Sequence, residues 1–599
     1  MRIAYKGRMA DDTDTASAIP TLEDWQHWTW VMGRAQQMLM ETWADGLPKD
    51  AGWPAAASPW GAFPPAFPAG SPMTTDPAAL FSAGAEAWAK GLETWGKMIG
   101  LDPEAKENAK DRRFAAPEWQ ESPVFDTIRK TYLALSDKLL GTAEELDGLD
   151  DESRHRLMFA VRSFVDAMSP SNFALTNPQV LKRTMETRGE NLLKGLANML
   201  DDIAAGQLTQ TKQGVFEVGR NLATTPGKVI KETPLYQLIQ YTPTTDEVLE
   251  TPLVIFPPWI NRFYILDLTP EKSFVKWCVD QGISLFMVSW KSADESIADA
   301  TLDDYVLNGQ IDAIDTVRDL LGVESVHTIG YCVAGTTLAA TLAYLTAHKQ
   351  QSKVKSATFL TAQVDFSSAG DLKLFTGADT VALLDEITRD SGYLDGRYMA
   401  ATFNLLRGRD LIWSYVVNNY LMGDEPAPFD LLHWNSDTTN LPASWHRDYI
   451  ESFYKGNKLA EKGGINVAGT AVDIDTVKTP TYVQAGREDH ISPPESVWKI
   501  MGHFTGPKRF VLAGSGHIAG VVNPPAAEKY QHWTNNEPAD TLETFIAGAE
   551  EHKGSWWPDW LAWLKSQDPA TVPANGARVP GKGKLKPIED APGRYVKAR

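Results

Sequence analysis

Three side chains that together could carry out covalent catalysis occur in the order Cys332, Asp489 and His517. A cysteine sulfur can attack a carbonyl carbon, a histidine can remove the thiol proton, and a carboxylate can orient the histidine. Each of the three comes shortly after a short, largely apolar run that we expect to form a strand. The set therefore predicts nucleophilic chemistry with sulfur as the nucleophile.

Cys332 lies at the apex of a predicted strand, turn and helix. The run at 325–330 is rich in β-branched residues and ends in glycine, and an Ala- and Leu-rich helix is expected over about 336–348. A nucleophile elbow needs small residues two positions before and two positions after the reactive side chain, because the strand and helix backbones nearly touch there. Gly330 and Ala334 occupy these positions. The thiol would then project at a helix N-terminus, where the macrodipole and free N–H groups favour the thiolate.

Burial as a small hydrophobic side chain is the alternative for any isolated cysteine. It is our interpretation of Cys278, which falls on the apolar stripe of a helix predicted over 274–280. Two cysteines in 599 residues exclude a disulfide framework and suit a reducing compartment.

The base and the acid that would act with Cys332 are identified by their places after predicted strands. Among eleven histidines, His517 alone combines a glycine-rich loop with a place directly after a predicted strand. Asp489 follows the strand predicted at 481–484, and Asp365, after an earlier strand, is the rival acid. We favour Asp489 because the acid of the α/β-hydrolase fold commonly lies one strand before the histidine. The order nucleophile, acid, base also belongs to that fold.

An oxyanion hole in this fold uses two backbone N–H groups. The first should come from Val333, directly after the cysteine, and the second from the turn at 257–262. Proline has no N–H group, so Ile260 is our candidate for the second donor.

Composition narrows the class of protein. The formal net charge of -20 argues against a protein that tracks nucleic-acid phosphates. No window approaches eighteen uninterrupted apolar residues, and the polar N-terminus lacks the apolar core of a secretory signal. We therefore expect a cytoplasmic protein without a transmembrane segment, and association with lipid-like surfaces stays open. No metal site and no cofactor are expected.

Three regions are predicted: N-terminal helices and a Pro/Ala-rich linker over 1–120, a helical N-terminal domain over 121–230, and an α/β-hydrolase catalytic domain over 231–599. A tryptophan-rich stripe that starts near Thr21 could pack on another helix or dock to a partner or a hydrophobic particle. The spacing G-x-x-x-x-G-K at 91–97 lacks both the following Ser/Thr and a preceding strand, so we reject a nucleotide loop.

Short apolar runs alternate with helices in the last region, as in a doubly wound, mostly parallel sheet. A large insertion at 366–479 is expected to form a cap over the active site. The cap is rich in aromatic residues, which could either pack the cap or line a site for an apolar acyl chain. The predicted strands are 253–256, 283–289, 325–330, 357–362, 481–484 and 509–512.

A cysteine nucleophile also predicts the fate of the acyl group. A thioester on the enzyme is close in energy to an acyl-CoA thioester, so loading is nearly reversible and the acyl group stays activated for a later alcohol. An enzyme that only hydrolyses esters gains less from this arrangement. Transfer is therefore favoured over hydrolysis.

Beyond about residue 120 the chain resembles the polyhydroxyalkanoate synthases, in particular class I, the poly(3-hydroxybutyrate) type. The likeness rests on these motifs: SPSNF at 169–173, FPPWINR at 256–262, YILDL at 264–268, GYCVAGT at 330–336, PFDLL at 428–432, WNSD at 434–437, REDH at 487–490, GHIAG at 516–520 and NPP at 523–525. Two positions depart from the family: Ala334, where many relatives carry glycine, and the cap stretch at 445–447.

The resemblance implies a Cys332 nucleophile, a His517 base and an Asp489 acid that polymerise (R)-3-hydroxyacyl-CoA, most simply 3-hydroxybutyryl-CoA, with release of CoA. It also implies coenzyme A contacts from Arg407, Asn457 and His490. Further implied partners are the growing polyester chain, a granule surface, granule-associated proteins and a second copy in a homodimer. A thioesterase or polyester depolymerase of the same fold and a non-catalytic granule-coat protein are the alternatives.

Overall fold

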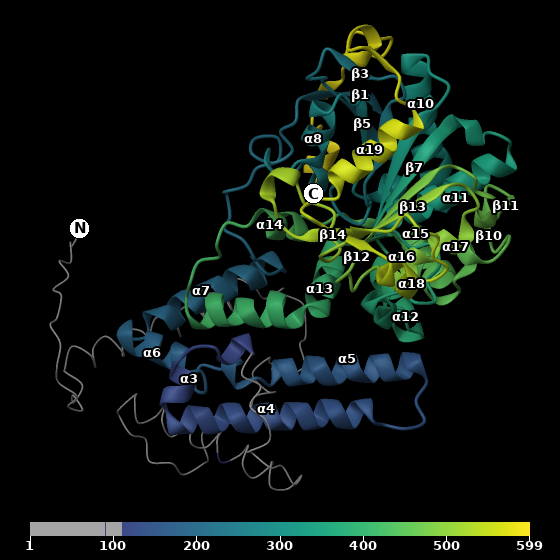
Figure 1. The fold of residues 1–599 in the computed structure, drawn as a ribbon. Coiled ribbons are helices and arrows are strands. Elements are labelled where there is room, and N and C mark those ends of the chain that lie inside the picture. The colour runs from purple at the N-terminus through teal and green to yellow at the C-terminus, as the bar shows by residue number, and fades with distance from the viewer. Residues whose placement is uncertain (1–89, 91–110, 599) are drawn as a thin grey trace, which may run out of the picture. The chain divides into compact units, whose positions relative to one another are not determined.

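The computed structural model describes residue 90 and residues 111–598 (Figure 1). The described residues fall into two compact units. The first, called here the helical unit, runs to Leu208 and also contains Gly408–Glu425; the second, the catalytic unit, contains Thr209–Arg407 and the chain from Pro426 onward. The predictions for the tryptophan-rich stripe, the Pro/Ala-rich linker and the 91–97 segment lie outside the described residues.

The α-helices described in the helical unit are α3 (Glu118–Glu121), α4 (Pro123–Glu144), α5 (Asp151–Ala167), α6 (Pro178–Glu186) and α7 (Glu190–Ala205). The first three helices, α3, α4 and α5, bring apolar residues together around Trp119, Ile128 and Tyr132. The chain between Pro178 and Ala205 forms two helices rather than one, because it turns through left-handed backbone at Arg188 and Gly189.

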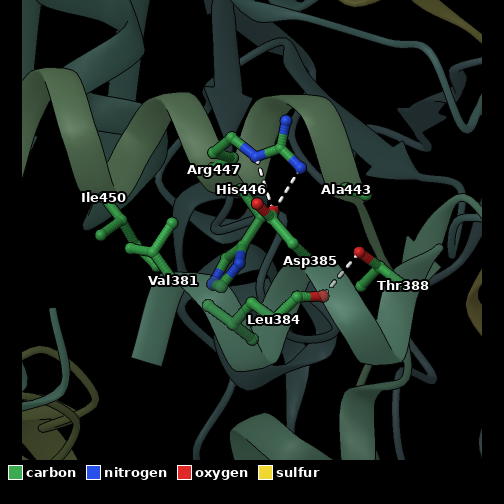
Figure 2. Close-up of a pocket in the computed structure, with 8 residues that line it drawn as sticks. All are labelled: Val381, Leu384, Asp385, Thr388, Ala443, His446, Arg447 and Ile450. Carbon is green, nitrogen blue, oxygen red and sulfur yellow. Dashed lines mark hydrogen bonds and ion pairs between the residues drawn. The ribbon is translucent and has the colours of Figure 1, made fainter. Parts of the chain in front are cut away.

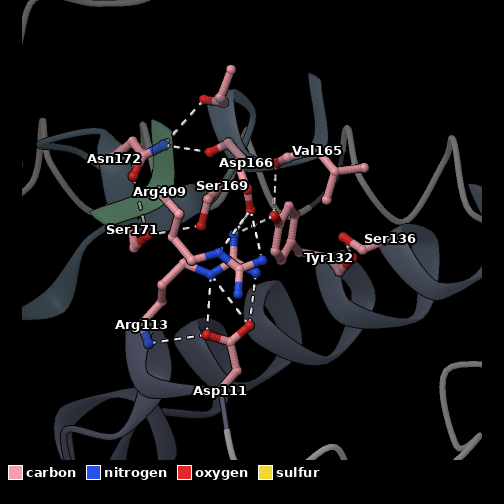
Figure 3. A network of polar contacts seen from close by, with 11 residues as sticks. Asp111, Arg113, Tyr132, Ser136, Val165, Asp166, Ser169, Ser171, Asn172 and Arg409 are labelled. Atoms are coloured by element: carbon pink, nitrogen blue, oxygen red, sulfur yellow. Dashed lines mark hydrogen bonds and ion pairs between the residues drawn. The ribbon is translucent and has the colours of Figure 1, made fainter. Parts of the chain in front are cut away.

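A network of charges joins the segment Gly408–Glu425 to the rest of the helical unit (Figure 3). The Asp166 carboxylate accepts hydrogen bonds from Arg113 Nη1 at 3.1 Å and from Arg409 Nη2 at 2.7 Å. The hydroxyls of Tyr415 and Tyr420 both donate to one oxygen of Asp202 at 2.7 Å. This segment lies inside the predicted cap in sequence, but its packing places it in the helical unit.

The catalytic unit contains an eleven-stranded sheet in the order β15-β14-β13-β12-β7-β6-β4-β5-β2-β1-β17. The six central strands from β13 to β5 are parallel, and antiparallel strands extend both edges. The strands are β1 (Gly227–Glu232), β2 (Tyr236–Tyr241), β4 (Leu253–Phe256), β5 (Leu285–Trp290), β6 (Val326–Tyr331), β7 (Val354–Leu360), β12 (Thr481–Gly486), β13 (Lys508–Ala513), β14 (Gln531–Thr534), β15 (Glu550–Lys553) and β17 (Glu589–Asp590).

Helices cover both faces of this sheet, so its central strands are apolar throughout. In β4, Val254 and Phe256 belong to one hydrophobic cluster, and Leu253 and Ile255 belong to the other. The first cluster includes residues of α10 (Asp312–Leu321) and α11 (Val333–Ala347), and the second includes residues of α8 (Phe274–Asp280) and α19 (Trp557–Gln567).

The predicted elements of the catalytic unit have bounds close to those in the structure. The bounds of β4 and α8 are as predicted, and each of the other predicted strands differs from the structure by one to three residues at one or both ends. The helix after Cys332 starts at Val333 rather than near Thr336. The antiparallel strands at the edges, including β1 and β2, were not predicted, because their pairing depends on distant strands such as β17.

The insertion between β7 and β12 contains the cap helices α12 (Ala378–Thr388), α13 (Gly396–Leu406), α14 (Asp430–Ser436) and α15 (Ala443–Asp448). Helices α12 and α15 pack together, and Arg447 Nε donates to Asp385 Oδ1 at 2.8 Å across them (Figure 2). His446, on α15, lies beside this pair and lines a cavity of only about 10 Å³. Burial lowers the pKa of His446 to about 4, so the imidazole is neutral at neutral pH. None of the described helices is both long and apolar enough to cross a bilayer.

Candidate active site

Cys332 occupies a strained turn between β6 and α11. Its backbone has φ 53° and ψ -127°, a conformation rare for a residue with a side chain. A Cβ atom added to Gly330 would lie 2.5 Å from Gly335 Cα, and one added to Gly335 would lie 2.4 Å from Ala362 Cβ. The strand and the helix therefore approach each other closely, as predicted. On the helix side the residue nearest to the strand is Gly335 rather than the neighbouring Ala334.

The structure brings Cys332, His517 and Asp489 together from the ends of three strands. His517 Nδ1 lies 2.7 Å from Asp489 Oδ2, and the His517 side chain is also hydrogen-bonded to Cys332. The Asp489 side chain is fully buried, and its second oxygen accepts the backbone N–H groups of Ile491 and Ser492, each at 2.9 Å. These bonds fix the carboxylate, which in turn fixes the orientation of the imidazole.

The charges around His517 favour its protonated form. Burial alone would lower the pKa of His517, but the Asp489 carboxylate, the Cys332 sulfur and hydrogen bonds to both raise it well above its ordinary value. A proton on His517 is therefore stabilised by the neighbouring Asp489 carboxylate, so the imidazole is well placed to accept one from a group beside it.

This raised pKa predicts how stability depends on pH. The proton on His517 stabilises the fold fully below the unfolded value of 6.5, and this contribution is lost as the pH rises through the raised pKa of the folded state. We expect the free energy of unfolding to fall from about pH 6.5 upward, and to fall less in His517→Gln. Denaturant titrations of both proteins between about pH 6 and 9 measure this difference. If the free energy of unfolding fell equally with pH in both proteins, the raised pKa could not be assigned to His517.

The rival acid, Asp365, makes a different set of contacts. Its Oδ1 atom accepts the Ser367 N–H at 2.8 Å and Asn457 Nδ2 at 3.0 Å, and its carboxylate forms ion pairs with Lys499 and His503. Burial would raise the pKa of Asp365, but the hydrogen bonds from His503 and Ser367 hold it well below its usual range. Asp365 is therefore a charged anchor at the start of the insertion, and Asp489 is the carboxylate in contact with the histidine.

The two predicted oxyanion donors both line the cavity beside Cys332. Within the described part of the chain, the backbone N–H groups of Val333 and Ile260 donate no hydrogen bond. The turn that carries Ile260 is held from outside, because Trp290 Nε1 donates to Pro257 O at 2.8 Å and Thr439 Oγ1 donates to Trp259 O at 2.9 Å. Two free donors on a fixed backbone are what an oxyanion hole requires.

The cavity at Cys332 has a volume of about 70 Å³ and a mostly apolar wall. Four aromatic residues of the insertion line it, namely Phe403, Trp434, Tyr449 and Tyr454, whereas Trp445 and Phe453 are buried in packing contacts. Gln363, Asn435 and Asn261 also line it; no local pattern in the sequence distinguishes them. The lining residues are Pro258, Ile260, Asn261, Tyr331, Cys332, Val333, Thr336, Gln363, Leu372, Phe403, Trp434, Asn435, Tyr449, Tyr454, Ile491, Ser492, His517 and Ile518.

Asn457, predicted to contact coenzyme A, lies outside this lining. Its side-chain oxygen accepts the Phe366 N–H at 2.7 Å and its amide donates to Asp365 at 3.0 Å. Asn457 itself has left-handed backbone, with φ 47°. Its side chain thus ties the segment after β7, at the start of the insertion, to a position 91 residues further along the chain.

Arg407 and His490, the other two predicted contacts, are also absent from the lining. The backbone oxygen of His490 accepts the Asp371 N–H at 2.9 Å. Burial lowers the pKa of the His490 imidazole, and the positive charge of Arg407 acts in the same direction. The positive charge of Arg407 thus favours a neutral His490 imidazole, next in sequence to Asp489. Among the described residues, no group of three or more His, Cys, Asp and Glu side chains is arranged to hold a metal ion.

Comparison with known proteins adds to this geometry. Residues 110–278 match the family described as Poly-beta-hydroxybutyrate polymerase (PhaC) N-terminus, and residues 254–524 match the alpha/beta hydrolase fold. The second match confirms the predicted fold class, and the first agrees with the predicted helical N-terminal region.

Several curated proteins are similar over most of the chain. The Poly(3-hydroxyalkanoate) polymerase subunit PhaC of Rhizobium meliloti (strain 1021) is 46% identical over 86% of this chain and 84% of its own length. The protein of the same name from Rhizobium etli is 45% identical over 86% of this chain and 81% of its own. The Poly(3-hydroxyalkanoate) polymerase of Methylorubrum extorquens is 45% identical over 86% of this chain and 85% of its own length. The chain therefore belongs to the polyhydroxyalkanoate polymerases, acyltransferases built on the α/β-hydrolase fold.

Proposed function

We propose that this enzyme polymerises (R)-3-hydroxyacyl-CoA, most simply 3-hydroxybutyryl-CoA, through an acyl thioester on Cys332. The observation that supports this mechanism most strongly is the Cys332–His517–Asp489 arrangement, with a sulfur at the elbow and a buried carboxylate on the histidine. Arg407, Asn457 and His490 are proposed to contact coenzyme A, and no metal or cofactor is invoked.

Loading is an exchange of one thioester for another. His517 removes the Cys332 proton, and the sulfur attacks the acyl carbonyl carbon, whose oxygen receives the N–H groups of Val333 and Ile260. The bond between the acyl carbon and the CoA sulfur then breaks, and His517 returns the proton to CoA. Because a thioester replaces a thioester, the acyl group keeps its activation.

Elongation uses that activation to form an ester. The 3-hydroxyl of a second hydroxyacyl unit gives its proton to His517, oriented by Asp489, and its oxygen attacks the Cys332 thioester carbon. An ester bond forms, the carbon–sulfur bond breaks, and the proton passes from His517 to the sulfur. Each cycle lengthens the polyester by one unit and consumes no water.

The cap must move for this reaction. The cavity at Cys332, about 70 Å³, has room for only a few water molecules, whereas ligand sites are commonly 300–1,000 Å³. An acyl-CoA therefore enters only when the cap helices separate from the nucleophile. In that open form the Asn457 amide would leave Asp365 and Phe366 and become available to coenzyme A.

The products distinguish this proposal from its alternatives. Incubation with 3-hydroxybutyryl-CoA should release free CoA in step with insoluble polymer, and mass spectrometry after brief exposure should find the acyl group on Cys332. Free 3-hydroxybutyrate without polymer would indicate a thioesterase or depolymerase. If neither free 3-hydroxybutyrate nor polymer forms and no CoA is released, the protein is a non-catalytic coat protein.

The product also suggests where the enzyme works. A water-insoluble polyester that stays attached to the enzyme accumulates as a particle, so we propose a cytoplasmic granule with the polymerase at its surface. A homodimer and granule-associated proteins are the further partners that the family resemblance implies. Fractionation of cells that make polymer, with and without the acyl-CoA supply, tests whether the enzyme sediments with the polymer.

A further inference from the structure

The turn that carries Ile260 ends in an arginine that is almost completely buried. The Arg262 and Asp437 side chains are 1% and 2% exposed, and Arg262 Nε donates to Asp437 Oδ1 at 3.2 Å. The other oxygen of Asp437 accepts the Tyr264 hydroxyl at 2.8 Å. Burying such a pair is costly unless the remaining donors also find partners.

Those partners are backbone carbonyls far along the chain. Arg262 Nη1 donates to Tyr595 O at 3.2 Å, and Nη2 donates to Ala598 O at 2.6 Å and to Thr438 O at 3.2 Å. The segment 595–598 is itself anchored, because Val596 is buried. One planar guanidinium thus joins the turn, the loop after α14 and the segment 595–598 with donors in fixed directions.

The backbone of Arg262 is hydrogen-bonded to residues of the cavity wall. Its N–H donates to the side chain of Asn261 at 2.8 Å, and its carbonyl accepts Trp434 Nε1 at 2.7 Å. Both Asn261 and Trp434 line the cavity at Cys332. Ile260, whose free N–H is the proposed oxyanion donor, lies two residues away.

We propose that Arg262 is a positioning residue for acyl transfer. Asp437 and the carbonyls of the segment 595–598 hold its guanidinium, and the guanidinium holds the backbone that presents the Ile260 N–H to the acyl oxygen. This inference rests on the proposed function, and it adds a segment more than three hundred residues away in sequence to the support of the oxyanion hole.

Lysine in place of Arg262 is the sharpest test. Lysine keeps the positive charge for Asp437 but cannot reach three carbonyls in the plane of a guanidinium. Small displacements of a reacting geometry cost about 10²-fold in rate, so we expect Arg262→Lys to slow acylation of Cys332 by roughly 10- to 100-fold. The KM for acyl-CoA should change by less than about threefold, because the turn acts on the reacting oxygen and not on the CoA moiety.

Arg578→Lys is the matched control. Arg578 is also buried, and its guanidinium donates to the carbonyls of Leu249 and Glu250 and to Ser284 Oγ, at 2.6–3.1 Å. None of these hydrogen bonds reaches the turn at 257–262. We expect this variant to lose stability in the same way while keeping the acylation rate within about twofold. An equal loss of acylation in both variants would overturn the proposal.

A second reaction of the Cys332 sulfur distinguishes a misplaced oxyanion donor from a general disturbance of the active site. Alkylation by iodoacetamide forms a sulfur–carbon bond and expels iodide without any oxyanion, so it needs the thiolate but not Ile260. Arg262→Lys should alkylate at Cys332 within about twofold of the wild-type rate. If alkylation falls as far as acylation, the substitution has disturbed the nucleophile itself and the proposal is wrong.

Deletion from Tyr595 onward tests the remote half of the support. It should lower acylation as Arg262→Lys does, and the two changes together should be no worse than either alone, because they remove the same contacts. If the losses of acylation rate in the two single variants multiplied in the double variant, the segment 595–598 would not act through Arg262. Failure of the proposed function is recognised separately, since Cys332→Ala would then leave CoA release intact.

Discussion

Cys332→Ala is expected to lower CoA release from 3-hydroxybutyryl-CoA by at least roughly 10⁴-fold and to abolish polymer. Without the sulfur no acyl-enzyme forms, and the oxyanion donors alone supply only residual catalysis. The site should otherwise remain intact, because Cys332 is partly exposed and the elbow geometry depends on Gly330 and Gly335. CoA release measured with a thiol reagent, together with the mass of the protein after exposure to substrate, checks this result.

The second cysteine provides the control. Cys278 is fully buried in α8, and burial raises the pKa of its thiol well above the ordinary value, so it is an unreactive packing residue. Cys278→Ala should keep full CoA release and acquire the acyl group at Cys332 as wild type does. A polymerase that survives Cys332→Ala but not Cys278→Ala would reverse the assignment of the nucleophile.

Asp489→Asn is expected to lower the rate of CoA release by roughly 10²- to 10⁴-fold. Asparagine fits the space but cannot stabilise the imidazolium, and its amide favours the wrong tautomer of His517, whose Nδ1 atom now lies 2.7 Å from the carboxylate. The loss should appear in kcat and leave KM nearly unchanged, because Asp489 is buried behind the histidine. Steady-state kinetics with 3-hydroxybutyryl-CoA measure both constants.

Asp365→Asn is the matched variant, because it removes the other strand-end carboxylate. It should keep kcat within about threefold, since Asp365 contacts Asn457, Lys499 and His503 rather than the triad histidine. It should instead lower stability at neutral pH. The depressed pKa of Asp365 contributes stability that is present above its unfolded value and lost as the pH falls. If Asp365→Asn were the more damaging change to kcat, the acid would have to be reassigned.

The sequence alone was sufficient for the features that depend on neighbours in the chain. The small residues around Cys332 predict the elbow, because a strand and a helix joined by so short a turn must approach closely. Strand β4 is bounded as predicted, because burial on both faces leaves a continuous apolar run. Helix α8 is bounded as predicted because its apolar residues recur with helical spacing on one buried stripe. The order of Cys332, Asp489 and His517 follows from the parallel topology, and the structure brings these three together.

Only the tertiary structure decided the contacts that join distant parts of the chain. The sequence offers Arg262 as one more charged residue of a motif, and nothing local indicates that it meets Asp437 and the segment 595–598. Likewise, the family resemblance implies that Asn457 contacts coenzyme A, and only the structure shows that its side chain is hydrogen-bonded to Asp365 and to the Phe366 N–H. Periodicity reports which face of an element is buried, but the partner of a buried polar group is set by the packing of whole elements, which no short window of sequence contains.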